Sequence, residues 1–156
     1  MLRLSKKTEY ALIALQYIAL NQGRLVSAKE IASHYGISFE FVAKTLQNLA
    51  RQSFIVSQHG SSGGYALLRD PAAMSVAQVI EAVEGKPRLV ECCGEHGKDQ
   101  CSIHGQCTIK RPMSILQRRL DETLNSMTIQ QIAFPEAERY YAVQSVYAIA
   151  PTKIAP

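Results

Sequence analysis

All four cysteines of this 156-residue chain, Cys92, Cys93, Cys101 and Cys107, lie within one short glycine-containing stretch. Cysteines that serve as buried apolar residues would be scattered through helices, whereas thiols gathered on an irregular segment can converge on one soft metal centre. The chain has no run of about 18 apolar residues and no signal-like start, so we expect a cytoplasmic protein without a membrane span. Cytosolic thiols stay reduced, and the stretch therefore predicts a metal or redox site rather than a disulfide framework.

Zinc and a thiol switch are the chemical alternatives to an iron-sulfur centre. Structural zinc sites favour ligand pairs separated by two to four residues, but the stretch has no such cysteine pair, and His96 and His104 lack a finger-like spacing. Iron-sulfur ligation by thiolates tolerates wider gaps. A thiol switch formed by the adjacent Cys92 and Cys93, or by another disulfide of the stretch, stays open.

The positive charge of the chain is concentrated in its N-terminal part. Residues 1–70 hold eight Lys and Arg against four Asp and Glu, and residues 71–156 hold nine of each, which leaves the net charge of +4 in the first part. An anionic partner such as double-stranded DNA is therefore expected to bind there.

The first 51 residues predict three helices. Ser5 can cap a helix that runs to about Leu20, with an apolar stripe of Ala11, Ala14, Leu15 and Ile18. Ser27 and Glu30 have the spacing of a capping box, which predicts a short helix over 28–35, ended by Gly36.

Ser38 then caps the third helix, which carries Val42, Leu46 and Leu49 on one face. Its other faces hold Lys44, Gln47, Asn48 and Arg51. A short helix, a turn with glycine and a longer helix with outward polar residues is the helix-turn-helix pattern.

A β-hairpin is expected directly after the third helix. The runs 54–58 and 65–68 are predicted strands, and they flank a Gly/Ser loop whose glycines permit a close approach to a phosphate backbone. A flexible hairpin tip is the plain alternative, but the position after a helix-turn-helix favours a DNA-binding wing. His59, Ser61 and Ser62 offer hydrogen-bond donors in it.

Two further helices follow the wing. Ser75 caps a helix with the apolar stripe Val76, Val79, Ile80 and Val83, which ends at Gly85. Pro112 suits a first helical position, and a long helix is predicted from it, with Met113, Leu116, Leu120, Leu124 and Met127 at spacings of three and four. Such a helix packs either on the domain itself or on its twin in a homodimer, and we favour the dimer because a helix-turn-helix protein reads two half-sites.

The predicted fold is therefore mainly α with a small β-hairpin wing, a winged helix-turn-helix plus a long dimerisation helix. The DNA-binding domain spans residues 1–85, and the cysteine-rich segment, by which we mean residues 86–111, follows it. The dimerisation helix region spans 112–133. Residues 134–156 form a C-terminal extension that we expect to be partly disordered.

This order of elements resembles the Rrf family of winged-helix regulators, the group of IscR, NsrR and RirA. The matching stretches are 1–12, the wing 57–67 with its Gly-Gly-Tyr, the helix 75–84 and the four cysteines, and together they cover about residues 1–130. The resemblance implies a homodimeric, DNA-binding repressor or activator whose operator occupancy is set by a 2Fe-2S or 4Fe-4S cluster.

The resemblance also implies a ligand set of three cysteines and a fourth residue that varies. The spacing between Cys101 and Cys107 matches the family. Cys93 is the favoured first ligand, because the seven residues between it and Cys101 are nearer the family pattern than the longer gap after Cys92. Cys92 stays an alternative. One branch uses a histidine three residues after the last cysteine, where this chain has Lys110. Nitric-oxide-sensing relatives use an acidic residue on the first helix of the partner subunit, and Glu9 falls there. His34 falls where one relative ligates iron and is a further alternative. The plain interpretation of Glu9 is a carboxylate at the start of a helix, and that of His34 is a surface histidine.

We expect Ser38, Glu40, Lys44 and Gln47 on the third helix to contact DNA, together with the wing residues. Relatives that read two operator classes carry a glutamate where this chain has Ala43, which puts recognition of the second class in doubt. The sequence has no phosphate loop and no arrangement of catalytic acids or nucleophiles, so an enzyme is not expected.

The predicted function is regulation of iron-sulfur assembly or of iron and redox homeostasis genes, with a nitric-oxide-sensing repressor as the alternative within the family. A zinc-stabilised or thiol-switch interaction module without a cluster is the alternative of another class.

Overall fold

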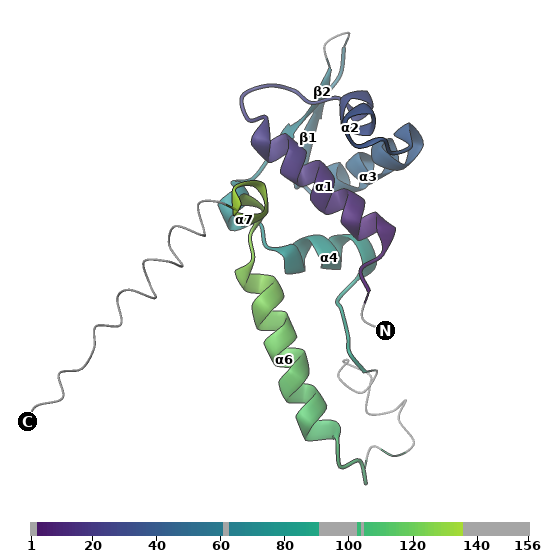
Figure 1. Ribbon diagram of the computed structural model, residues 1–156, viewed down its shortest axis with the longest axis vertical. Helices are drawn as coiled ribbons and strands as arrows, with labels where there is room; N and C mark the ends of the chain where they lie inside the picture. Colours follow the sequence, from purple (N-terminus) through teal and green to yellow (C-terminus); the bar gives the residue numbers. More distant parts are fainter. Residues whose placement is uncertain (1–2, 61–62, 91–102, 104, 136–156) are drawn as a thin grey trace, which may run out of the picture.

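The computed structural model describes residues 3–60, 63–90, 103 and 105–135, which form a mainly helical structure with a two-stranded antiparallel hairpin (Figure 1). The predicted mainly α fold with a β-hairpin is confirmed. The elements in chain order are α1 (Lys6–Leu20), α2 (Ala28–Tyr35), α3 (Phe39–Arg51), β1 (Ile55–Gln58), β2 (Gly64–Leu67), the 3-10 turn η1 (Pro71–Ala73), α4 (Val76–Glu84), α6 (Lys110–Ser126) and α7 (Ile129–Ala133).

Helix α1 lies at the centre of the core, as its apolar stripe predicts. Ser5 caps it by accepting a hydrogen bond from the Thr8 amide, and Ala11, Ala14, Leu15 and Ile18 are all buried. These side chains pack against α3, α4 and α7, so that elements distant in the sequence share one core. The burial of this stripe contributes to the apolar driving force for folding of the domain.

Helices α2 and α3 form the predicted helix-turn-helix. Gly36 ends α2 in the left-handed conformation, at a φ of 63°, which lets the chain turn into α3. The Ser27 hydroxyl caps α2 as predicted, accepting from the Glu30 amide at 3.1 Å. The Glu30 carboxylate, however, is held mainly by Arg24, which lowers the pKa of Glu30, and it also accepts from the Tyr17 hydroxyl at 3.0 Å. Glu30 therefore joins α2 to α1 rather than acting mainly as a capping residue.

The hairpin is fixed to the connection between α1 and α2. Its register pairs Ile55 with Leu67 and Gln58 with Gly64, close to the predicted strands. Tyr65 also exchanges two backbone hydrogen bonds with Val26, of 2.9 and 2.8 Å. A Cβ on Gly64 would lie 2.9 Å from the Val26 carbonyl oxygen, so only glycine fits there. The end of the hairpin next to its loop and the start of α2 are thus one unit.

Helix α6 extends away from the rest of the domain (Figure 1). It begins at Lys110, so the predicted start at Pro112 is wrong, and it ends at Ser126. Its one buried residue is Gln117, while the side chain of Leu116 in the predicted apolar stripe is 48% exposed. After Met127 the chain turns back, and α7 packs against α1. Helix α6 packs against α4, and Met113, Leu120 and Leu124 of the predicted stripe are half-buried, whereas Leu116 and Met127 of that stripe are exposed.

Candidate nucleic-acid interface and cysteine-rich segment

The outward face of α3 borders a groove on the wing side. The groove has a volume of about 570 Å³ and lies between α3, the start of α2 and the hairpin. It is lined by Ser27, Ala28, Lys29, Phe39, Gln47, Ala50, Arg51, Ser57, Gln58, His59, Gly60, Gly63, Gly64 and Tyr65. We call it the wing groove. Lys29 and Arg51 bring positive charge to it, and backbone amides and hydroxyls add hydrogen-bond donors, which are the groups that contact DNA phosphates.

A second hollow of about 310 Å³ lies on the other side of α3, towards the start of α1 and the end of α4. It is lined by Lys7, Phe41, Lys44, Thr45, Gln47, Asn48, Arg51 and Val83. We call it the helix pocket. The polar and basic residues of α3 therefore stand between two concave surfaces, and each of these carries lysine or arginine. This is the shape expected of a helix that enters a major groove while its flanks meet the two phosphate backbones.

The predicted DNA-binding residues fall on these surfaces or beside them. Gln47 borders both hollows, Lys44 borders the helix pocket and His59 borders the wing groove. Ser61 and Ser62 lie outside the described residues.

Ser38 and Glu40 form a pair at the start of α3. The prediction that the Ser38 side chain caps this helix is wrong, because its hydroxyl donates to the Glu40 carboxylate instead. That hydrogen bond lowers the pKa of Glu40, which keeps the exposed carboxylate ionised as a hydrogen-bond acceptor. An ionised Glu40 can accept from a cytosine amino group but repels phosphate.

Among the residues that line the hollows, Lys7, Lys29, Phe39 and Phe41 are charged or aromatic side chains that were not predicted from the sequence. Lys29 could have been found from the cap at Ser27, because residues at the start of a capped helix lie beside its free amides. Phe41 is 58% exposed, and no local pattern distinguishes it from a core residue. Lys7 joins the site only through the packing of α1 beside α3 and α4.

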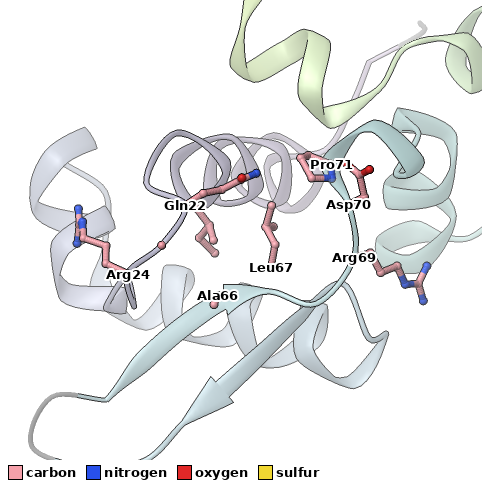
Figure 2. Close-up of a pocket in the computed structure, with 9 residues that line it drawn as sticks. Gln22, Arg24, Ala66, Leu67, Arg69, Asp70 and Pro71 are labelled. Carbon is pink, nitrogen blue, oxygen red and sulfur yellow. The ribbon is translucent and has the colours of Figure 1, made fainter.

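A further hollow of about 370 Å³ lies between the end of α1 and β2 (Figure 2). Its charged groups are already engaged. Arg24 pairs with Glu30, Asp70 accepts from the Ala72 amide at 2.9 Å, and Arg69 lies 5.0 Å from the centre of the Phe54 ring. This hollow is therefore not a candidate ligand site.

Cys107 is the one predicted cysteine ligand within the described residues; Cys92, Cys93 and Cys101 lie outside them. Its thiol is free and half-buried at the start of α6, beside a hollow of about 630 Å³ that Lys110, Arg111 and Arg118 also line. The first turn of α6 carries no acidic residue, so its side chains add positive charge to the positive end of the helix dipole. A soft thiolate donor in positive surroundings fits an iron-sulfur cluster, whose thiolate-bound form carries negative charge.

The other predicted ligands, Glu9 and His34, lie apart from one another. Glu9 is 36% exposed and pairs with Lys6 on the same helix. The His34 ring packs at a tilt against Tyr17, with ring centres 4.9 Å apart, and Tyr17 is about 12 Å further along α1 than Glu9. Within the ranges that the structure describes, no three His, Cys, Asp or Glu residues are grouped in a way that could hold a metal ion.

Glu84 ties the start of the cysteine-rich segment to α1. Its carboxylate accepts hydrogen bonds from the hydroxyls of Ser5 and Thr8, and the first of these is the main cause of its lowered pKa. Thr8 is fully buried, so its hydroxyl depends on the Glu84 carboxylate as a hydrogen-bond acceptor. Glu84, two residues before the segment, is thus anchored to Ser5 and Thr8 at the start of α1, the part of the helix that carries Glu9.

Comparison with known proteins gives consistent matches. The model of the Rrf2 family, described as iron-dependent transcriptional regulators, matches residues 4–135. The chain is 31% identical over 139 residues to the HTH-type transcriptional regulator IscR of Sodalis glossinidius, which covers 86% of this chain and 81% of that protein. It is 30% identical over 131 residues to Protein aau3 of Rhizobium meliloti, with 84% of each chain covered.

Two solved structures are similar to this chain along most of their length. CymR, the global cysteine regulator of B. subtilis, has a TM-score of 0.68 and 25% identity, and the match covers 85% of this chain and 97% of that one. IscR of T. potens has a TM-score of 0.68 and 24% identity, with 89% and 90% covered. Among the described helices, none has both the length and the apolar character needed to cross a membrane.

Proposed function

Because the chain belongs to the Rrf2 family of DNA-binding transcriptional regulators, which are not enzymes, we propose that its operator affinity is set by an iron-sulfur cluster in the cysteine-rich segment. The observation that carries the proposal is the placement of the two ends of that segment. Cys107 lies at the positively charged start of α6, and Glu84 ties the other end to α1. A change in the segment can therefore reach the DNA-binding domain directly.

Cys93, Cys101 and Cys107 are the proposed thiolate ligands, with Cys92 as the alternative for the first of them. Glu9 from a second copy of the chain is the proposed fourth ligand. Its pairing with Lys6 is an exposed ion pair, which costs little to break, and this supports its availability. His34 is the less suitable alternative because its ring already packs against the rings of Tyr17 and Tyr35. When bound, the cluster would link the cysteine-rich segment to α1 of the second copy, and a redox change or nitric oxide could break this link.

The DNA contacts are proposed to come from both sides of α3. Lys44, Gln47 and Glu40 face the base edges, with Ser38 holding Glu40 in place. His59 and the wing serines Ser61 and Ser62 contact one phosphate backbone together with Lys29. Lys7 contacts the other backbone, from the far side of the helix pocket.

The homodimer is proposed to form through the exposed apolar residues of α6. Ile115, Leu116 and Met127 stay exposed beside the face of α6 that packs against α4, and pairing with a twin would bury them. A dimer also places two α3 helices on two half-sites. Genes of iron-sulfur assembly, or of iron and redox homeostasis, are the proposed targets, in keeping with the iron-dependent description of the family.

A nitric-oxide-sensing repressor is the alternative within the family, and a thiol switch is the second candidate function. The thiol switch is supported by the free, half-buried thiol of Cys107 and by the likeness to CymR, a cysteine regulator. A zinc-stabilised module is the remaining alternative.

Anaerobic purification with counts of iron, acid-labile sulfide and zinc tests the proposal. We expect a brown protein that contains sulfide, and we expect Cys101→Ser and Cys107→Ser to lose the colour. Only Cys93→Ser should match that loss if Cys93 is the first ligand, whereas equal tolerance of Cys92→Ser and Cys93→Ser would mean that the two substitute for each other. Stoichiometric zinc without sulfide would end the iron-sulfur proposal.

A further inference from the structure

The side-chain amide of Gln117 holds the first residues of the cysteine-rich segment, shortly after the end of α4. Its Oε1 accepts from the Leu89 amide at 2.8 Å, and its Nε2 donates to the Pro87 carbonyl at 3.0 Å. Nε2 also donates to Asp121, one turn further along α6, at 2.9 Å. These contacts attach residues 87–89 to the middle of α6, beside which they run (Figure 1).

Glutamine is chemically suited to this position. A side-chain amide offers one carbonyl and two N–H donors, so it can pair with the alternate peptide groups of an extended segment as a neighbouring strand would. The carbonyl and both N–H groups of Gln117 are used, and the residue is only 8% exposed. A glutamate would lose both donors and face the Asp121 carboxylate, and a leucine would lose all three hydrogen bonds.

The attachment lies close to both sets of cysteines along the chain. Leu89 is three residues before Cys92, and three residues span at most about 10 Å. Gln117 is eight residues into the helix from its N-cap, Ile109, and therefore about 12 Å from the end that carries Cys107. The start of the segment is thus held within reach of its last cysteine.

We propose that Gln117 is a positioning residue that fixes the separation between the two ends of the cysteine-rich segment. It is not itself a ligand and acts through the backbone of residues 87–89. The importance of this separation for regulation rests on the proposed function, because a cluster requires its thiolates at defined distances. The separation itself is a property of the chain without any metal.

The test compares Gln117→Leu and Gln117→Glu with the parent protein. Asn125→Ala is the matched control, because Asn125 donates to the Asp121 carbonyl within α6 and touches nothing outside the helix in the contacts that the structure describes. In metal-free, reduced protein, a short bis-maleimide should link Cys107 to Cys92 or Cys93, as mapped by peptide mass. We expect the yield of this link to fall several-fold in both Gln117 variants and to stay unchanged in Asn125→Ala.

A second measurement follows the loss of cluster absorbance in air after anaerobic isolation. We expect several-fold faster loss in both Gln117 variants, with helix content by circular dichroism equal to that of the parent. An unchanged link yield in both variants would overturn the positioning role, as would a lower yield accompanied by a matching loss of helix. A parent protein without sulfide, but with the lower link yield in the variants, would overturn the proposed function and leave the positioning role supported.

Discussion

The rings of Tyr10 and Phe41 meet edge to face, with centroids 6.2 Å apart and planes inclined by 63°. This contact joins α1, which carries Glu9, to α3, which carries the residues proposed to read DNA. Phe41 is otherwise largely exposed, so the Tyr10 ring is a main constraint on its position. A rotation of α1 would therefore be transmitted to α3 at this point.

Tyr10→Leu is expected to reduce the difference in DNA affinity between the cluster-loaded and the cluster-free protein. An aromatic pair of this kind contributes about 0.5 to 1.5 kcal/mol, so the ratio of the two affinities should fall about two- to tenfold. Titration of labelled operator DNA with each form measures it. Phe39→Leu is the control, because it removes an exposed ring of the same helix and should change both affinities equally. A Tyr10→Leu ratio equal to that of the parent would show that α1 does not act through Phe41.

Lys44→Ala and Lys7→Ala are expected to weaken DNA binding in different ways, although both lysines line the helix pocket. Lys44 lies on α3, and its loss should cost about 1 to 3 kcal/mol and relax specificity at one base pair. Lys7 lies on α1, and its loss should weaken binding to all sequences alike and lower the salt slope by about one unit. Binding to operator and scrambled DNA over a series of salt concentrations separates the two effects. The opposite assignment of the two patterns would mean that α3 enters the groove in another orientation.

Glu9→Ala is expected to leave the cluster assembled on three cysteines while shifting its absorption spectrum and hastening its loss in air. The removal of an oxygen ligand leaves the thiolates in place but opens one position. Lys6→Ala is the matched control, because it removes the ion-pair partner of Glu9 and leaves the carboxylate free. If both variants keep the parent spectrum and cluster-dependent DNA binding, Glu9 is an ordinary helix-start carboxylate, and His34 and Cys92 become the next residues to test.

Glu84→Ala is expected to lower the free energy of unfolding of the cluster-free protein by about 1 to 3 kcal/mol, because the buried Thr8 hydroxyl loses its acceptor. Glu84→Gln keeps an acceptor oxygen and should cost less. Denaturant unfolding at neutral pH measures both values, and equal losses would show that the charge rather than the hydrogen bond matters.

The same carboxylate predicts a dependence of stability on pH. The pKa of Glu84 is lowered in the folded protein from its ordinary value of 4.5, so its contribution is present above that value and is lost as the pH falls through the folded pKa. The stability advantage of the parent over Glu84→Gln should therefore shrink as the pH drops below about 4.5. An advantage that stays constant through this range would exclude the titration of Glu84 as its source.

Local patterns in the sequence predicted the elements that depend on local interactions. The apolar spacing of Ala11, Leu15 and Ile18 defined α1, and Ser75 with Gln78 forms a full capping box at α4, where the sequence predicted a cap at Ser75. The predictions that failed concern side chains with a choice of partners. The Ser38 hydroxyl donates to the Glu40 carboxylate instead of accepting from an amide at the start of α3. Helix α6 begins at Lys110, two residues before Pro112, since a proline is tolerated anywhere in the first turn, where the amides have no partner within the helix.

The candidate site was only partly predictable for the same reason. Lys44, Gln47 and His59 could be predicted because they lie within a helix-turn-helix and a wing that are recognisable from local sequence. The hydrogen bonds of Glu84 and Gln117 join residues that are between 28 and 79 positions apart in the sequence. Lys7 reaches the helix pocket only because α1 packs beside α3. No short sequence spacing encodes either kind of contact. The ligand roles of Cys92, Cys93 and Cys101 stay predictions, since these residues lie outside the described part of the chain.

The close contact between Gly64 and the Val26 carbonyl limits how this regulator could acquire a new operator. A side chain at Gly64 would push the hairpin away from the connection that leads into α2, and both walls of the wing groove would move together. A change of DNA preference is therefore open at the outward side chains of α3, where substitutions act one contact at a time. At the loop end of β2, by contrast, a single substitution would disturb every contact in the wing groove at once, and directed evolution of this protein should leave Gly64 unchanged.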